Sequence, residues 1–329
     1  MEKIDYINLV NLPLIDIFRL VDELRRETKR EDIDLCSIVN AKSGTCSENC
    51  KFCAQSSHHS TSVLKYPILS ANEIVEEANK AVSIGARRFG IVTSGNSLTS
   101  DEIEIICDAI LKIKSIADID ICASLGALPY TDFVLLKKSG LKRYHHNIET
   151  SPRFYAQMVT THDFSERILT IKNAKKAGLE VCSGGIIGLG ETWEDRIDMA
   201  ILLSEMHVNA VPINILVPIA GTPLQYAESL SVKDILKTIA IFKLILKTKV
   251  IKIAAGREKY FDSEYVKLSY DTEINEICKY FNIKDPGTLI YLAGASGMMI
   301  GGYLTIRGRE VKDDYKLLDE VFELWGKEK

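Results

Sequence analysis

Short apolar segments alternate with amphipathic segments along most of the chain, and this alternation constrains the fold more than any other feature. Eight segments have the β-branched or apolar composition of strands: 35–40, 88–93, 120–125, 143–148, 180–187, 210–217, 250–254 and 297–303. Strands that alternate with helices pair in parallel, because each helix returns the chain to the same end of the sheet. Eight such units predict an α/β fold, a (β/α)8 barrel of the TIM type, with active-site groups at the carboxyl ends of the strands.

Helix-start signals support this reading. Ser70 with Glu73, Thr99 with Glu102, and Asp163 with Glu166 have the spacing of capping boxes. An open doubly wound sheet is the alternative, but the phosphate-binding G-x-G-x-x-G pattern does not follow the first strand. Since no Gly-, Pro- or Ser-rich linker interrupts the chain, we expect a single domain over 1–329. Its parts are an N-terminal helical extension (1–34), the barrel (35–308) and a C-terminal helix (309–329).

Charge and hydropathy exclude several classes of protein. Lysine and arginine total 41 and aspartate and glutamate 45, a net charge of −4, so we expect no nucleic-acid partner and no polybasic membrane patch. No apolar run reaches the roughly 18 residues of a membrane-spanning helix, and the acidic first segment is unlike a signal peptide. A cytoplasmic globular enzyme is expected.

Three of the eight cysteines lie within eight residues, as Cys46-x-x-x-Cys50-x-x-Cys53. A cytoplasmic chain of this size does not need disulfides, so the cluster indicates metal or redox chemistry. Three thiolates can hold three irons of a 4Fe–4S cube and leave the fourth open. Zinc is the alternative, with His58 or His59 as the fourth ligand.

The triplet, with the aromatic Phe52 before its last cysteine and the first barrel strand before it, resembles the radical S-adenosylmethionine superfamily. The resemblance implies that the open iron chelates the amino and carboxylate groups of S-adenosylmethionine. It also implies reductive cleavage of that cofactor to a 5′-deoxyadenosyl radical, with the cofactors carrying the difficult chemistry.

Further motifs resemble the biotin synthase family within that superfamily, in order and spacing: 144–152, 181–191, 211–217, 221–224 and 255–258. The resemblance spans about 35–308. It implies a sulfurtransferase that inserts sulfur into dethiobiotin to give biotin, with an auxiliary iron–sulfur cluster as the sulfur source. Two alternatives remain: a hydrogenase-maturation or methylornithine-forming enzyme of the same subgroup, or a non-catalytic iron–sulfur carrier.

Residue roles follow from this resemblance. Cys46, Cys50 and Cys53 would hold the first cube. The resemblance places S-adenosylmethionine against Phe52, Glu149, Arg167, Gly184, Ile186, Gly188 and Glu191. In it, Glu149 binds the ribose and Arg167 the methionine carboxylate. The residues expected to contact dethiobiotin are Arg88, Asn147, Asn214 and Thr305, with Arg88 and Thr305 near its carboxylate. The two asparagines would bind its ureido ring, because an amide supplies both a donor and an acceptor.

Strand periodicity gives an independent indication. Alternate residues of a strand share a face, which points His145, Asn147, Cys122, Cys182 and Asn214 into the barrel. Barrel interiors are ordinarily filled with Val, Ile and Leu, so these polar side chains indicate a bound ligand. Taken singly, Cys182 would read as a small core residue and Asn214 as a hydrogen-bonded core amide.

Two departures from the family pattern stand out. The usual auxiliary 2Fe–2S cluster has three cysteines and an arginine, and its first cysteine follows Arg-Phe on the second strand; here that position is Gly90. Cys36, ten residues before the triplet, instead lies at a position of the first strand whose side chain is expected to point into the barrel. The second departure is additional sequence between Arg257 and Gly294, expected to be helical.

We therefore expect an auxiliary cluster on Cys36, Cys122 and Cys182, with Arg257 nearby. Three thiolates suit a 4Fe cube whose open iron carries an extra sulfide, and a 2Fe–2S cluster is the alternative. Such a cluster would suit an anaerobic host. The resemblance further implies a flavodoxin- or ferredoxin-type electron donor, cluster-assembly proteins as partners and a homodimer.

Overall fold

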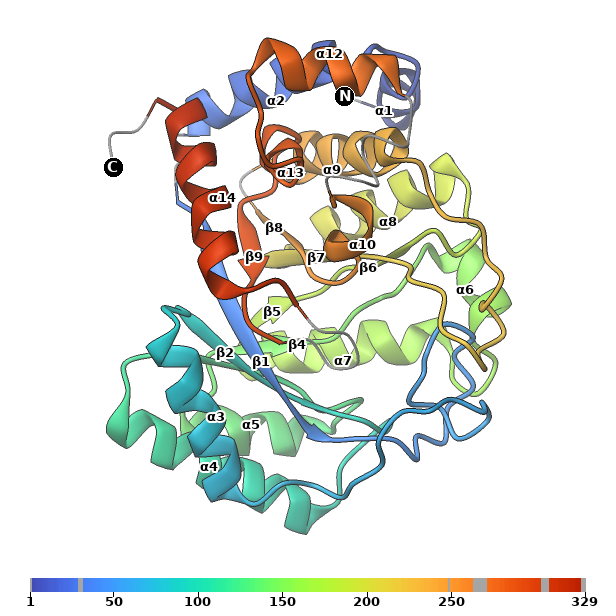
Figure 1. Cartoon of the computed structure of the whole chain (residues 1–329). Coiled ribbons are helices and arrows are strands. Elements are labelled where there is room, and N and C mark those ends of the chain that lie inside the picture. Colours follow the sequence, from blue (N-terminus) through green and yellow to red (C-terminus); the bar gives the residue numbers. More distant parts are fainter. Residues whose placement is uncertain (1, 29–31, 248, 263–270, 303–307, 327–329) are drawn as a thin grey trace.

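The computed structural model describes residues 2–28, 32–247, 249–262, 271–302 and 308–326, and its centre is a ring of parallel strands (Figure 1). The strands are β1 (Asp34–Lys42), β2 (Arg88–Thr93), β3 (Asp120–Ser124), β4 (Arg143–His145), β5 (Glu180–Cys182), β6 (Gly185–Ile187), β7 (Ala210–Ile215), β8 (Val250–Ile253) and β9 (Gly297–Met299). Their order is β5-β4-β3-β2-β1-β9-β8-β7-β6, and a further β5–β7 pairing closes the ring. Because β5 and β6 are halves of one interrupted strand, the described residues confirm the eight-stranded (β/α)8 barrel.

Helices cover the outside of the barrel (Figure 1). They are α3 (Ala71–Ser83), α4 (Ser100–Ile116), α5 (Tyr130–Ser139), α6 (Pro152–Met158), α7 (Phe164–Lys176), α8 (Trp193–Glu205), α9 (Val232–Leu246), α10 (Arg257–Tyr260) and α13 (Thr288–Leu292). The expected capping boxes of α3, α4 and α7 are present, with Ser70, Thr99 and Asp163 as N-caps. These caps satisfy backbone N–H groups that have no partner within the helix.

Further helices precede and follow the strands: α1 (Lys3–Leu9), α2 (Leu14–Thr28), α12 (Thr272–Tyr280) and α14 (Val311–Leu324). Figure 1 shows α2 and α12 together at one end of the molecule, beyond α9. The α2 helix buries Leu14, Ile17, Phe18 and Val21, and the Leu14 amide donates to Glu273 at the start of α12. None of the helices in the described ranges is both long and apolar enough to cross a membrane.

The segment 180–187 differs from expectation, because it is broken into β5 and β6 rather than forming one strand. A Cβ on Gly184 would lie 1.9 Å from the carbonyl oxygen of Pro212, and one on Gly185 would lie 2.3 Å from that of Glu149. The two glycines therefore let three backbone segments touch. Where the ladder is interrupted, Asn147 Oδ1 accepts a hydrogen bond from the Gly184 amide at 3.1 Å. The side chain of Asn147 thus takes the place of a backbone carbonyl of a neighbouring strand, next to the barrel interior.

Candidate active site

The cysteine triplet lies on the loop that follows β1, with Cys50 buried and the other two thiols partly exposed. The loop is braced by its own backbone, since the Cys46 amide donates to Gln55 O and the Cys53 amide to Cys50 O. Burial, together with the neighbouring thiols, raises the pKa of Cys50 to about 12 and that of Cys53 to about 11. Such thiols form thiolates only when a cation compensates them, and this donor set therefore fits an iron–sulfur cluster.

The two histidines next to the triplet face the loop backbone. Nε2 of His58 lies 2.9 Å from Ser47 O, and Nε2 of His59 lies 3.0 Å from Cys50 O. In the described part of the chain, no three His, Cys, Asp or Glu side chains converge as ligands for one ion. Because both imidazoles contact the loop backbone, this geometry favours the cube over zinc.

An apolar cluster packs around Cys50, the buried member of the triplet. Cys50 is packed with buried side chains of α6 and of the loops after β6 and β7: Phe154, Tyr155, Met158, Val159, Leu189 and Leu216. Phe52 and Cys53 pack against the same cluster. Low polarity around a cluster strengthens the electrostatic effect of every charge near it.

Arg167 lowers and Glu149 raises the pKa of Cys50, so both charged groups lie close to this loop. Arg167 Nη1 lies 3.7 Å from Glu149 Oε1 and donates to Asn147 O at 2.9 Å. Glu149 has a left-handed backbone (φ 69°), and its carbonyl accepts from the Ile186 amide at 2.8 Å. The residues expected at the ribose and carboxylate of S-adenosylmethionine thus lie together beside the triplet.

The 184–191 segment is shaped mainly by protein contacts. Gly184 is required by the approach of Pro212, and Gly188 by its positive φ of 93°. The Glu191 carboxylate accepts from the Gly188 and Leu189 amides at 2.9 and 2.6 Å and pairs with Arg196 at 2.7 Å. Its oxygens hold the loop in place, so Glu191 positions the loop rather than offering its carboxylate to a ligand.

A second site lies inside the barrel, in a cavity of about 320 Å³. Its lining includes all three thiols expected at the auxiliary cluster, Cys36, Cys122 and Cys182, and both asparagines expected at the substrate, Asn147 and Asn214. The Asn214 amide donates to Gly185 O at 3.3 Å. Burial, together with the Cys36 charge, raises the pKa of Cys122 to about 12. Strand periodicity therefore brings to one cavity side chains that lie far apart in the sequence.

Charged residues lie beneath these thiols. They are the first residues of five successive strands together with one residue of β8: Asp34, Arg88, Asp120, Arg143, Glu180 and Lys252, here called the charged floor. Asp34 Oδ2 lies 3.0 Å from Lys252, 3.1 Å from Arg88 and 3.6 Å from Arg143. Although burial alone would raise it, these cations hold the pKa of Asp34 below its ordinary value.

Lys252 joins the charged floor to the thiols, because its Nζ donates to Cys36 Sγ at 2.6 Å. Burial acts to lower the pKa of Lys252, but Cys36 and Asp34 raise it overall, so the side chain is cationic. A buried cation next to three thiols is a second environment able to stabilise thiolate sulfur.

Comparison with known proteins agrees with this geometry. Residues 41–203 match the Radical SAM superfamily, and residues 212–277 match the Biotin and Thiamin Synthesis associated domain. The chain is 48% identical over 295 residues to a biotin synthase of Thermotoga neapolitana, covering 89% of this chain and 98% of that protein. It is 42% identical over 321 residues to a biotin synthase of Clostridium botulinum, covering 98% of this chain and 94% of that protein. The chain belongs to the biotin synthase family.

Solved structures share the fold. A methylornithine synthase superposes with a TM-score of 0.77 at 17% identity, over 97% of this chain and 92% of that one. The FeFe-hydrogenase maturase HydG from Carboxydothermus hydrogenoformans superposes with a TM-score of 0.75 at 17% identity, over 97% of this chain and 75% of that one. At this identity the likeness extends to the barrel alone. Membership of the biotin synthase family implies a 4Fe–4S cluster and S-adenosylmethionine, which the triplet and its charged neighbours fit.

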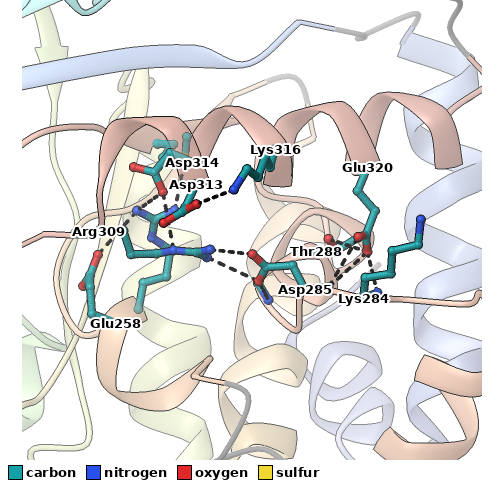
Figure 2. A network of polar contacts seen from close by, with 12 residues as sticks. Glu258, Lys284, Asp285, Thr288, Arg309, Asp313, Asp314, Lys316 and Glu320 are labelled. Atoms are coloured by element: carbon teal, nitrogen blue, oxygen red, sulfur yellow. Dashed lines mark hydrogen bonds and ion pairs between the residues drawn. The ribbon is translucent and has the colours of Figure 1, made fainter.

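Arg257, expected near the auxiliary cluster, does not itself line the cavity, although its neighbours Gly256 and Glu258 do. Its guanidinium is 2% exposed and contacts Asp314 at 2.9 Å, Met298 Sδ at 2.8 Å and Glu258 at 3.4 Å. Figure 2 shows the surrounding network, in which Arg309 also reaches toward Asp314. This arginine fastens α14 to the barrel, and Lys252 provides the cation beside the thiols.

Arg88 also lies elsewhere than expected for a group at the substrate carboxylate. It bridges Asp34 at 3.1 Å and Asp120 at 2.8 Å in the charged floor. As the first residue of β2, it lies at the amino end of the barrel, with both of its partners also first in their strands. Thr305, the other residue expected at that carboxylate, falls outside the described residues.

The sequence reasoning missed Lys252, although a lone lysine in the otherwise apolar run of β8 was a visible signal. It also missed Glu48 and His162, which contact each other beside the triplet at 2.7 Å. Gly90, which stands where the family usually has a cysteine, does line the cavity. A Cβ there would lie 3.0 Å from Ile38 Cγ2, so β1 leaves little room for a larger residue.

Proposed function

We propose that the protein is a radical S-adenosylmethionine sulfurtransferase that converts dethiobiotin to biotin. The observation that carries this proposal is the lining of one cavity by Cys36, Cys122 and Cys182 together with Asn147 and Asn214. A simple iron–sulfur carrier has no use for two amides beside its cluster. A sulfur-inserting enzyme needs this combination, because substrate and sulfur source must be in contact.

The residues at the triplet would serve the first cofactor pair. Together the 4Fe–4S cluster and S-adenosylmethionine supply a radical strong enough to remove hydrogen from saturated carbon. Cys46, Cys50 and Cys53 would hold the cluster, and Arg167 would pair with the methionine carboxylate. Phe52 and the apolar cluster around Cys50 would keep water out, since water would divert so reactive a species.

The residues of the cavity would position substrate against the sulfur source. Asn147 and Asn214 would hydrogen-bond the ureido ring. Cys36, Cys122 and Cys182 would hold the auxiliary cluster, and Lys252 would offset its negative charge. We favour a 4Fe cluster with an extra sulfide over 2Fe–2S, because only three cysteines line the cavity among the described residues. The proposal also includes a flavodoxin- or ferredoxin-type electron donor.

Anaerobic reconstitution tests the whole proposal. Protein with both clusters, S-adenosylmethionine, a chemical reductant and dethiobiotin should produce biotin together with 5′-deoxyadenosine. Cys46→Ala, Cys50→Ala and Cys53→Ala should each abolish deoxyadenosine formation, because the electron donor loses its ligands. Wild-type deoxyadenosine yields from any of these variants would overturn the radical assignment. Cofactor cleavage without any dependence on dethiobiotin would instead indicate another substrate.

A further inference from the structure

Arg167, at the start of α7, is held by hydrogen bonds on every nitrogen of its guanidinium. Nε donates to Tyr155 Oη at 2.7 Å, Nη1 to Asn147 O at 2.9 Å, and Nη2 lies 3.1 Å from His162 Nε2. Arginine has donors only, so His162 Nε2 must accept. The hydrogen of this neutral imidazole therefore lies on Nδ1.

Nδ1 of His162 lies 2.7 Å from Oε2 of Glu48 and donates to it. Both residues are buried, with 9% of each residue's surface exposed. Glu48 stands inside the cysteine triplet, between Cys46 and Cys50. The imidazole thus connects the cluster-binding loop to the guanidinium of Arg167 through two directional hydrogen bonds.

The segment that carries His162 is fastened to the same loop by further contacts. Asn49 Nδ2 donates to Thr160 Oγ1 at 2.6 Å, and its Oδ1 accepts from the Thr160 amide at 3.0 Å. The Lys51 amide donates to Met158 O at 3.0 Å. The loop and this segment are therefore one unit, and a shift of the loop is transmitted to His162.

His162 also bears on the spacing between Arg167 and Glu149. Their closest atoms are 3.7 Å apart, whereas a fully formed ion pair brings N and O to about 2.7–2.9 Å. The bonds to Tyr155, Asn147 and His162 fix the position of the guanidinium at this distance from Glu149. They use three of its five N–H groups, so two remain for a ligand.

We infer that Glu48 and His162 are positioning residues through which the cluster-binding loop aims Arg167 at the carboxylate of S-adenosylmethionine. This inference rests on the proposed function, in which Arg167 binds that carboxylate. In this arrangement Glu48 and His162 act through Arg167 and are not assigned a contact with the cofactor. Their effect is to couple correct folding of the loop to correct presentation of the guanidinium.

The central experiment measures S-adenosylmethionine affinity and iron content of anaerobically reconstituted protein. His162→Phe keeps the ring but removes both hydrogen bonds, and it should weaken binding about tenfold, or about 1.4 kcal/mol, at unchanged iron per chain. His58→Phe is the matched control, because His58 also bonds the triplet loop but not Arg167. It should retain wild-type affinity. Equal affinity in the two variants, with full iron, would overturn the inference.

A double-mutant cycle separates this inference from the function on which it rests. Arg167→Gln alone should weaken binding, and adding His162→Phe should then weaken it less than twofold further. Full additivity would show that His162 does not act through Arg167. No effect of Arg167→Gln would instead overturn the role of Arg167 in the proposed function. Glu48→Gln retains an acceptor and should stay within about threefold of wild type, whereas Glu48→Leu should resemble His162→Phe.

A measurement on the metal-free wild type avoids any failure of cluster loading. Nitrogen-15 NMR of labelled histidine should show His162 as the neutral tautomer with hydrogen on Nδ1. In Glu48→Leu, this fixed tautomer should give way to exchange between both forms. A wild-type His162 with hydrogen on Nε2 would overturn the inference irrespective of activity.

Discussion

The ammonium of Lys252 on β8 lies 2.6 Å from the sulfur of Cys36 on β1, and only β9 separates the two strands. Lys252 also contacts Asp34 at 3.0 Å, so one cation serves a carboxylate and a thiol. Burial raises the pKa of the Cys36 thiol, and the lysine counteracts that effect. The pair marks Cys36 as part of a charged site rather than a packed core thiol.

Cys36→Ser should impair the auxiliary cluster selectively. The triplet has three thiolates of its own, so cleavage of S-adenosylmethionine should persist while biotin formation fails. Iron should fall from about eight to about four per chain if both clusters are cubes. Cys107→Ser, on α4, is the matched control and should change neither quantity. Normal biotin yield and iron content in Cys36→Ser would show that the auxiliary cluster is held by other residues.

Lys252→Met should lower iron retention at the auxiliary cluster, because the thiolates lose their nearest cation. Lys252→Arg, which keeps the charge, is the matched control. In the metal-free protein the pKa of Cys36 should rise further in Lys252→Met. Less thiolate is then present at any given pH, so iodoacetamide should alkylate Cys36 more slowly around pH 8. Faster alkylation, or unchanged alkylation together with unchanged iron, would contradict the role assigned to this lysine.

Asn214→Ala and Asn147→Ala should weaken dethiobiotin binding, since an unpaired buried polar group costs roughly 1–3 kcal/mol. Titration calorimetry in the presence of S-adenosylmethionine measures this loss. Val92→Ala is a control for pocket shape, because Val92 lines the same cavity without a polar group. Unchanged affinity in both asparagine variants would remove these amides from the substrate site.

Asp195 should stabilise the fold in a pH-dependent way. It accepts hydrogen bonds from Ser151 at 2.7 Å, Arg153 at 2.9 Å and the Thr192 amide at 2.9 Å. Although burial opposes them, these donors hold its pKa well below the ordinary value. A lowered folded-state pKa contributes stability above about pH 4, the unfolded value, and this stability is lost as the pH falls further.

Asp195→Asn should therefore reduce the free energy of unfolding at pH 7 by about 1 kcal/mol, a typical cost at a helix start. The deficit should shrink as the pH is lowered below about 4. Urea denaturation of the metal-free protein at several pH values measures both effects. Asp313→Asn removes an exposed pair with Lys316 and should change little. A deficit that grows toward acid would contradict the assigned direction.

The parts of this site that follow from strand periodicity could be predicted from the sequence. The alternation of side chains along each strand was enough to predict that Cys36, Cys122 and Cys182 share one cavity, because this alternation is a local property. Capping boxes were likewise predictable, since both partners lie within four residues. Barrel closure then followed from the number of units.

Contacts that depend on the relative stagger of distant strands could not be predicted. Whether Lys252 or Arg257 contacts the thiols depends on how far β8 is shifted along its axis relative to β1. It also depends on Asp314 of α14, which pairs with Arg257. The break between β5 and β6 arises from the approach of Pro212 to Gly184, which no local pattern records. The pairing of Glu48 with His162 spans 114 residues.

The pairing of β1 with β9 joins the first strand of the barrel to the last one, so the barrel closes only when both have been made. Asp34 is in register with Gly297, and Cys36 and Lys252 are 216 residues apart in sequence. The hydrogen bonds between the triplet loop and the segment around His162, in contrast, need only the first half of the chain, although the apolar cluster around Cys50 also includes Leu189 and Leu216. During synthesis these hydrogen bonds can therefore form before β5 to β9 have been made. The cavity that we propose for the auxiliary cluster lacks part of its lining until Met299 of β9 has been translated, so we expect this cluster to be inserted after translation.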